Sequence, residues 1–248
     1  MKKGMTKITA VVMFCCCMFI LPFLAYGDEV NIGVVMPLTG KVAAVGLDTL
    51  HGAQIAAKEI NDEGGITVAG KKYNIVIREY DDEAAAAKTV AGMQMLKDRY
   101  NIPAVLQGLS GPTMAALQRN ERLGVIVMGF FKAPDATTRG NKLVLRHQTT
   151  AIGDAHDYAL GVANIMKAKT YALIADISDW GKDSSKAFES ELGKLGVKKV
   201  AGEWFDERTQ TDFRGQLTKI RAANPDVILV VGHDESSAGV IRQAHELG

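Results

Sequence analysis

From Val30 onward, the chain alternates short apolar runs, rich in β-branched residues, with longer segments in which apolar residues recur at helical spacing. This alternation is typical of parallel strands joined by crossover helices. We predict strands at residues 31–36, 73–79, 104–107, 125–128, 171–175, 198–204 and 227–231. The pattern therefore indicates an α/β fold built on open parallel sheets.

Helices are predicted between these strands. The helix over residues 47–62 would place Ile55, Ala56 and Ile60 on the face that covers a sheet, and Gly64-Gly65 would end it. Asp82 and Asp212 are each expected to cap the N-terminus of a later helix, because their side-chain oxygens can accept from free helical N–H groups.

A polar run at residues 146–153 interrupts the pattern, and a new series of strands and helices follows it. A chain of 248 residues also exceeds the length of one typical domain. We therefore expect a hinge at this run, with one lobe over residues 28–147 and a second over residues 148–248.

The N-terminus has the features of a processing segment. Three lysines precede an apolar run at residues 8–24, which leads into Ala25-Tyr26-Gly27. We expect residues 1–27 to be a signal peptide whose cleavage leaves Asp28 first and the mature protein in the periplasm, with an uncleaved anchor as the alternative.

Composition narrows the function classes. All three cysteines fall within residues 1–27, so the mature chain would have no disulfide and no thiol nucleophile. Without the three signal lysines, 26 basic side chains face 28 acidic ones, which is a net charge of −2 with histidine neutral. This balance predicts no nucleic-acid or anionic-membrane partner.

The candidate site lies where apolar runs end, because ligands of open parallel sheets bind beyond the carboxyl ends of the strands. Ser110-Gly111-Pro112 joins a strand to a helix, with Pro112 suited to its first position. Amides there, with the Ser110 hydroxyl, could hold a carboxylate or phosphate, although a simple helix cap is the alternative. The ligand-binding candidates are Ser110, Gly111, Phe130, Phe131, Lys132, Trp180 and His233.

The candidate residues differ in whether their side chains suggest a role in the core or in ligand binding. Phe130 and Phe131 could be ordinary core, which is the common fate of aromatic rings. Lys132 would supply a cation for an anionic ligand, and Trp180 follows a polar turn, as expected of a ring that covers a pocket.

Catalytic and cofactor motifs are missing from the sequence. The five histidines show no metal-ligand spacing, and no glycine-rich phosphate fingerprint opens a helix. Pro112 stands where a nucleophile elbow around Ser110 would need its second glycine. We therefore expect no metal, no cofactor and no enzymatic activity.

The chain resembles the periplasmic leucine/isoleucine/valine-binding protein family, the receptors of branched-chain-amino-acid-type ABC importers. The resemblance extends through almost all of the expected mature chain, and it depends on the order and spacing of short motifs. These are Ile32-Gly33-Val34-Val35-Met36-Pro37-Leu38-Thr39-Gly40, Gly52-Ala53, Glu59-Ile60-Asn61, Gly64-Gly65-Ile66, Tyr80-Asp81-Asp82, Ala133-Pro134-Asp135, Thr138-Arg139-Gly140, Thr211-Asp212-Phe213, Pro225-Asp226 and Ile241-Arg242-Gln243-Ala244.

This resemblance implies two Rossmann-like, doubly wound lobes that close over a solute like a flytrap. It implies that the Ser110 loop holds the ligand carboxylate, that the Lys132 loop contacts the α-ammonium, and that Trp180 and His233 close the pocket. It also implies an ABC permease as partner, a monomer, and C-terminal crossings beyond Gly248, so that the second lobe would be truncated. A sensor or chemoreceptor is the alternative function.

One departure from the family concerns the ligand. Lys132 stands where the amino-acid binders of this family have a threonine that contacts the ammonium, and a lysine repels an ammonium. The family's acidic ammonium partner is expected beyond Gly248. We therefore hypothesise a small carboxylate without an α-ammonium, an aromatic acid or a keto acid, whose charge Lys132 and the Ser110 loop share.

Overall fold

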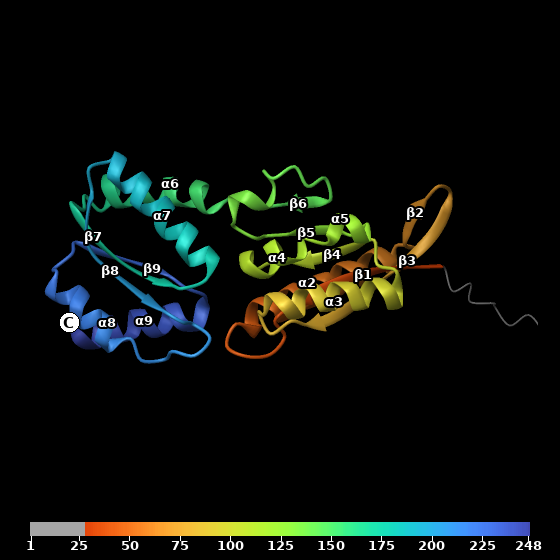
Figure 1. Ribbon diagram of the computed structural model, residues 1–248, viewed down its shortest axis with the longest axis horizontal. Coiled ribbons are helices and arrows are strands. Elements are labelled where there is room, and N and C mark those ends of the chain that lie inside the picture. The colour runs from red at the N-terminus through yellow and green to blue at the C-terminus, as the bar shows by residue number, and fades with distance from the viewer. Residues whose placement is uncertain (1–27) are drawn as a thin grey trace, which may run out of the picture.

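The computed structural model describes residues 28–248 and contains two separate sheets (Figure 1). The predicted signal peptide, residues 1–27, lies outside the described residues. We call the six-stranded part, residues 28–146, lobe 1, and the three-stranded part, residues 151–247, lobe 2. Within residues 28–248, no helix combines the length and apolarity needed to cross a membrane.

Lobe 1 contains eleven elements within the described chain. They are β1 (Asp28–Met36), α2 (Ala43–Asp62), β2 (Ile66–Val68), β3 (Lys71–Asp81), α3 (Ala86–Tyr100), β4 (Ala104–Gln107), α4 (Ser110–Ala116), α5 (Asn120–Leu123), β5 (Ile126–Gly129), the 3₁₀ turn η1 (Pro134–Ala136) and β6 (Val144–Arg146). Lobe 2 follows with α6 (Ala151–Leu160), the π-helical turn η2 (Gly161–Ile165), β7 (Thr170–Asp176), α7 (Asp179–Lys194), β8 (Lys198–Phe205), α8 (Arg214–Ala222), β9 (Val227–Val231) and α9 (Asp234–Leu247).

Both sheets place their first strand between two later ones. In lobe 1 the order is β2-β3-β1-β4-β5-β6, and every pairing is parallel except that of the short β2 with β3. In lobe 2 the order is β8-β7-β9, all parallel. Because the chain turns in opposite directions on the two sides of β1 and of β7, a crevice forms at their carboxyl ends, where open sheets bind ligands.

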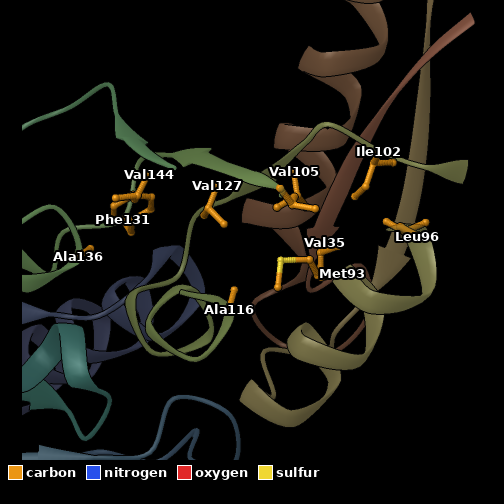
Figure 2. Close-up of a cluster of buried hydrophobic side chains, with 11 residues drawn as sticks. Val35, Met93, Leu96, Ile102, Val105, Ala116, Val127, Phe131, Ala136 and Val144 are labelled. Carbon is orange, nitrogen blue, oxygen red and sulfur yellow. The ribbon is translucent and has the colours of Figure 1, made fainter. Parts of the chain in front are cut away.

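Alternate residues of the central strands pack on opposite faces of each sheet. In lobe 1, Val35 packs with Met93 of α3 (Figure 2), whereas Val34 and Met36 pack with Leu50 of α2. Helices therefore cover both faces, which explains why the strands read as continuous apolar runs.

Lobe 2 is built in the same way. Tyr171, Leu173 and Ala175 of β7 pack under α6 and α7, and Ala172 and Ile174 pack under α8 and α9. The doubly wound fold expected of both lobes is thus confirmed.

The structure corrects the prediction for the first helix. It begins at Ala43, and its buried residues are Gly46, Leu50 and Ala57. Ile55 is 60% exposed, so the face predicted from Ile55 and Ala56 was wrong. The prediction chose the face with the large apolar side chain of Ile55. The face that packs on the sheet instead includes the small residues Gly46 and Ala57, which allow α2 to approach closely.

Both predicted aspartate caps lie just outside their helices. Asp82 accepts from the Ala84 amide at 2.9 Å and from the Thr89 hydroxyl at 2.7 Å, while Ala85 occupies the N-cap of α3. Asp212 accepts from the Arg214 amide at 3.1 Å, but Phe213 is the N-cap of α8. Each carboxylate therefore stabilises the turn that leads into the helix.

Two short strands were missed. Strands β2 and β6 have three residues each, too few for a period of two to show in the sequence. β6 also occupies part of the predicted hinge run at residues 146–153, and α6 begins at Ala151. The expected division between residues 147 and 148 lies in the link between these two elements.

Candidate functional site

A cavity of about 790 Å³ lies between the lobes, at the carboxyl ends of both sheets. From lobe 1 it is lined by the loops after β1, β3, β4 and β5, and from lobe 2 by the loops after β7, β8 and β9. Its charged and polar lining residues include Ser110, Lys132, Gln148, Asp176, Ser178, Asp179, Glu207, Arg208 and His233.

Six of the seven predicted site residues line this cavity. Ser110, Gly111, Phe130 and Lys132 do so from lobe 1, and Trp180 and His233 do so from lobe 2. Phe131 does not, because its side chain is fully buried in the lobe 1 core. Of the two successive rings, alternation along the chain directs only Phe130 toward the cleft.

The Ser110 hydroxyl connects two strand-end loops of lobe 1. Its Oγ accepts from the Lys132 amide at 3.2 Å and from the Ala133 amide at 3.1 Å. A hydroxyl that accepts twice still has one hydrogen to donate, so Ser110 can donate to a ligand anion. The position expected for Pro112, the first of the helix, is wrong: α4 begins at Ser110, so Pro112 is its third residue.

Lys132 has an acidic partner that the sequence did not reveal. Its Nζ lies 2.5 Å from Asp154 Oδ2, and both side chains are partly exposed. Asp154 belongs to the first turn of α6 and also accepts from the Thr149 hydroxyl. The ion pair spans the link between the lobes, so the Lys132 ammonium is held in place at the cleft wall.

The lobe 2 wall carries two aromatic rings in contact, tilted with respect to each other. Trp180 and His233 have ring centroids 4.6 Å apart at an angle of 48°. Trp180 is placed by the first turn of α7, where Ser178 Oγ accepts from the Gly181 amide at 3.2 Å. Asp176 at the end of β7 accepts from the Ser178 amide at 2.9 Å and fixes the same turn.

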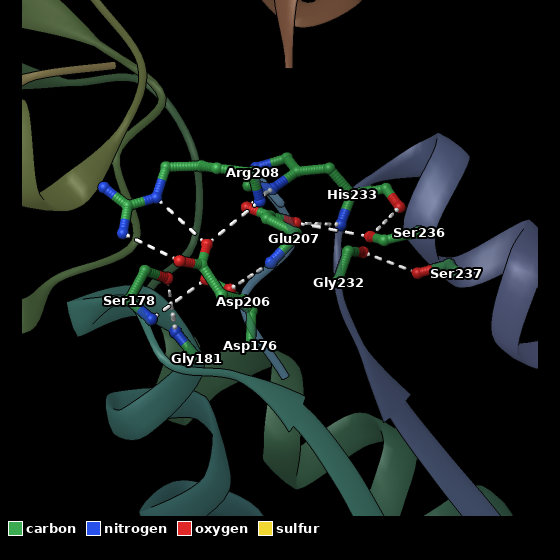
Figure 3. A network of polar contacts seen from close by, with 10 residues as sticks. All are labelled: Asp176, Ser178, Gly181, Asp206, Glu207, Arg208, Gly232, His233, Ser236 and Ser237. Atoms are coloured by element: carbon green, nitrogen blue, oxygen red, sulfur yellow. Dashed lines mark hydrogen bonds and ion pairs between the residues drawn. The ribbon is translucent and has the colours of Figure 1, made fainter. Parts of the chain in front are cut away.

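A buried carboxylate, that of Glu207, holds His233 (Figure 3). Glu207 Oε1 lies 2.7 Å from His233 Nδ1, and Oε2 accepts from the His233 amide at 3.0 Å and from the Ser236 hydroxyl at 3.3 Å. Burial raises the pKa of Glu207, but its contacts with His233 and Ser236 outweigh this effect, so the net pKa lies below the ordinary value. Glu207 is therefore a carboxylate at neutral pH.

A second cation of the cleft, Arg208, is also held by an acid. Its Nε and Nη2 lie 3.0 and 3.1 Å from the two carboxylate oxygens of Asp206. Hydrogen bonding and the opposite charge raise the pKa of Arg208 and lower that of Asp206, although partial burial opposes both shifts. Arg208 and Glu207 follow β8, a strand end that the sequence-based site omitted.

This arrangement of two cations, two aromatic rings and a hydroxyl donor can bind a small charged solute. Ser110 Oγ accepts from amides, and no general base contacts it among residues 28–248. Over the same range, no group of three His, Cys, Asp or Glu side chains could hold a metal ion.

A family model described as periplasmic binding protein matches residues 29–248. The Leu/Ile/Val-binding protein homolog 3 of Brucella melitensis is 32% identical over 229 residues, which are 90% of this chain and 60% of that protein. The Leu/Ile/Val/Thr-binding protein of Salmonella typhimurium is 28% identical over 238 residues, 94% of this chain and 63% of that protein.

A solved structure of a related protein has a similar fold. The branched-chain amino acid transporter substrate binding protein LivJ of Streptococcus pneumoniae, in complex with isoleucine, has a TM-score of 0.80 and 27% identity; the match covers 89% of this chain and 62% of that one. The chain thus spans about 60% of the length of such relatives. With the family model extending over nearly all described residues, the chain belongs to the periplasmic binding protein family.

Proposed function

We propose that this chain captures a small carboxylate solute between its two lobes, residues 28–147 and 148–248, for an ABC importer. The observation that carries the proposal is the cavity of about 790 Å³, lined from both lobes at the strand ends. Ligand sites of small-molecule binding proteins have this size and this mixture of apolar and polar walls. The partner would be a permease, the protein a periplasmic monomer, and the activity binding without chemistry.

The anion would be held from lobe 1. The Ser110 hydroxyl has a hydrogen to donate, and the Lys132 ammonium lines the same cavity. A carboxylate placed there would share Lys132 with Asp154. Trp180 and His233 would cover the rest of the solute when the lobes close.

Two solute classes fit these groups. The names of the relatives favour a branched-chain amino acid, whose ammonium could approach the Asp154 carboxylate. Lys132 instead favours an aromatic or keto acid without an ammonium, because a cation at this position repels one.

Calorimetry with leucine, 4-methyl-2-oxopentanoate and benzoate tests the proposal. If the anion pairs with Lys132, Lys132→Met should weaken binding of the two ammonium-free acids by roughly tenfold, the typical effect of losing a charge-assisted hydrogen bond. Lys142→Met, at an exposed position of lobe 1, serves as the matched control.

The outcomes separate the classes. Tight leucine binding that Lys132→Met leaves unchanged would favour the amino acid and refute the role of Lys132. Failure of all three carboxylates to bind would refute the proposed function.

A further inference from the structure

The imidazole of His233 is held on one side and open on the other. Glu207 contacts both its Nδ1 and its backbone amide. Nε2 makes no hydrogen bond to any residue in the described part of the chain, and it is not among the enclosed unpaired atoms. His233 lines both the large cavity and an adjoining one of about 210 Å³, so the open nitrogen is accessible there.

Glu207 decides which ring nitrogen carries the hydrogen. A carboxylate can only accept hydrogen bonds, so His233 Nδ1 must donate to it. In a neutral imidazole the other nitrogen is then a lone-pair acceptor. The orientation of Glu207 is fixed, because Oε2 accepts from the His233 amide at 3.0 Å and the Glu207 backbone amide donates to Asp176 Oδ1 at 3.1 Å.

We propose that Glu207 is a positioning residue that makes His233 Nε2 a hydrogen-bond acceptor in the cleft, and that the solute presents a hydrogen-bond donor, a hydroxyl or amino group, to lobe 2. This inference rests on the proposed function and specifies the end of the solute that the lobe 1 groups do not hold. The Trp180 ring beside His233 would cover the apolar part of the solute that bears the donor.

The variant Glu207→Gln tests the positioning role independently of any solute. The His233 amide donates to the Oε2 side, so the amide oxygen of glutamine must take that place. Its NH₂ group then faces Nδ1, which has to accept, and the hydrogen moves to Nε2. The nitrogen in the cleft would change from acceptor to donor.

Nitrogen-15 NMR of the His233 ring at pH 8, where a free imidazole is neutral, reads this change directly. We expect the Nδ1–H tautomer in the wild type, the Nε2–H tautomer in Glu207→Gln, and no change in the control Glu203→Gln on the same strand-loop segment. An Nε2–H tautomer in the wild type, or one tautomer in both proteins, would overturn the positioning role.

Near-isosteric solute pairs test the donor. Threonine should bind better than valine, or 4-aminobenzoate better than 4-methylbenzoate, by about three- to tenfold, the usual worth of one hydrogen bond. Glu207→Gln should remove most of the preference for 4-aminobenzoate, whose aromatic amine donates but hardly accepts; the threonine hydroxyl can also accept from Nε2–H, so that pair does not test the variant. His233→Phe keeps a ring against Trp180 but has no nitrogen atoms, so it should also remove the preference for the solute with the donor. This variant replaces Glu207→Gln in the test if Glu207→Gln does not fold.

Each result has a separate meaning. Equal affinities within the pair that binds would overturn the inference and leave solute capture standing. Absence of binding by all four carboxylates would overturn the proposed function and the solute half of this inference, while the NMR result would still decide the tautomer.

Discussion

At the residue scale, a fully buried acid supports the loop that contributes Ala84 to the cleft. Asp82 follows β3 and accepts from the Ala84 amide, which helps to hold Glu83 and Ala84 at positive φ values of 49° and 58°. Burial raises the pKa of Asp82 above its ordinary value of 3.8, although the hydrogen bonds from Thr89 and Ala84 oppose the shift.

This shift makes stability depend on pH. Between pH 3.8 and the raised pKa the folded chain holds more protons than the unfolded chain, so the free energy of unfolding contributed by Asp82 falls as pH rises. Asp82→Asn does not titrate, and its amide can donate to the Thr89 hydroxyl. We therefore expect the variant to gain stability relative to the wild type from pH 4 to pH 7.

Urea unfolding at several pH values measures this difference. Asp98→Asn, on the exposed surface of α3, should show no such trend. A difference between wild type and Asp82→Asn that stays constant over the range would contradict the prediction.

At the scale of elements, the position of α2 depends on a glycine at its start. A Cβ added to Gly46 would lie 1.8 Å from the Pro37 carbonyl oxygen, a contact that cannot be relieved by moving a side chain. Gly52 lies in the same helix with no atom within 4 Å of an added Cβ. Substitution of Gly46 therefore tests the effect of close packing, and substitution of Gly52 tests the effect of helix propensity alone.

Alanine at these two positions should have opposite effects. Gly46→Ala should lower the free energy of unfolding by about 1–3 kcal/mol, because the strand-to-helix turn must move. Gly52→Ala should raise it by about 0.8–1 kcal/mol through helix propensity. Chemical denaturation of both variants measures this, and destabilisation by Gly52→Ala would show that α2 is more crowded than described.

At the scale of the whole molecule, the lobes approach each other around the cleft. Lys41 Nζ lies 3.4 Å from the Gln210 carbonyl oxygen, and an added Cβ on Gly111 would meet Asp179 Oδ2 at 3.4 Å. The link between β6 and α6 joins the lobes at one side (Figure 1). Under the proposed function, the two lobes would close as rigid bodies around the solute.

Tryptophan fluorescence should report that closure. Of the two tryptophans, Trp180 lines the cleft, whereas Trp204 on β8 lies 44% exposed and does not line it. Addition of a binding carboxylate should change the emission of the wild type and of Trp204→Phe, but not of Trp180→Phe. A signal that persists in Trp180→Phe would place the solute elsewhere.

Features that depend on residues close together in the sequence could be predicted, whereas contacts between residues far apart in the sequence could not. The seven predicted strands are all present, with ends that agree to within three residues, because apolar runs and turn residues act locally. Six of seven candidate site residues line the cleft for a related reason: parallel strands bring their carboxyl ends to one edge. Whether they contact the solute stays a prediction.

The sequence by itself determined the order of the elements, the α/β class and the sheet edge where the cavity lies, since each follows from periodicity over a few residues. Only the tertiary structure decided which charges meet. Lys132 and Asp154 are 22 residues apart, and Glu207 and His233 are 26 apart on the ends of different strands. Such pairs depend on how strands are ordered in the sheet and how the lobes are joined, which local sequence does not encode.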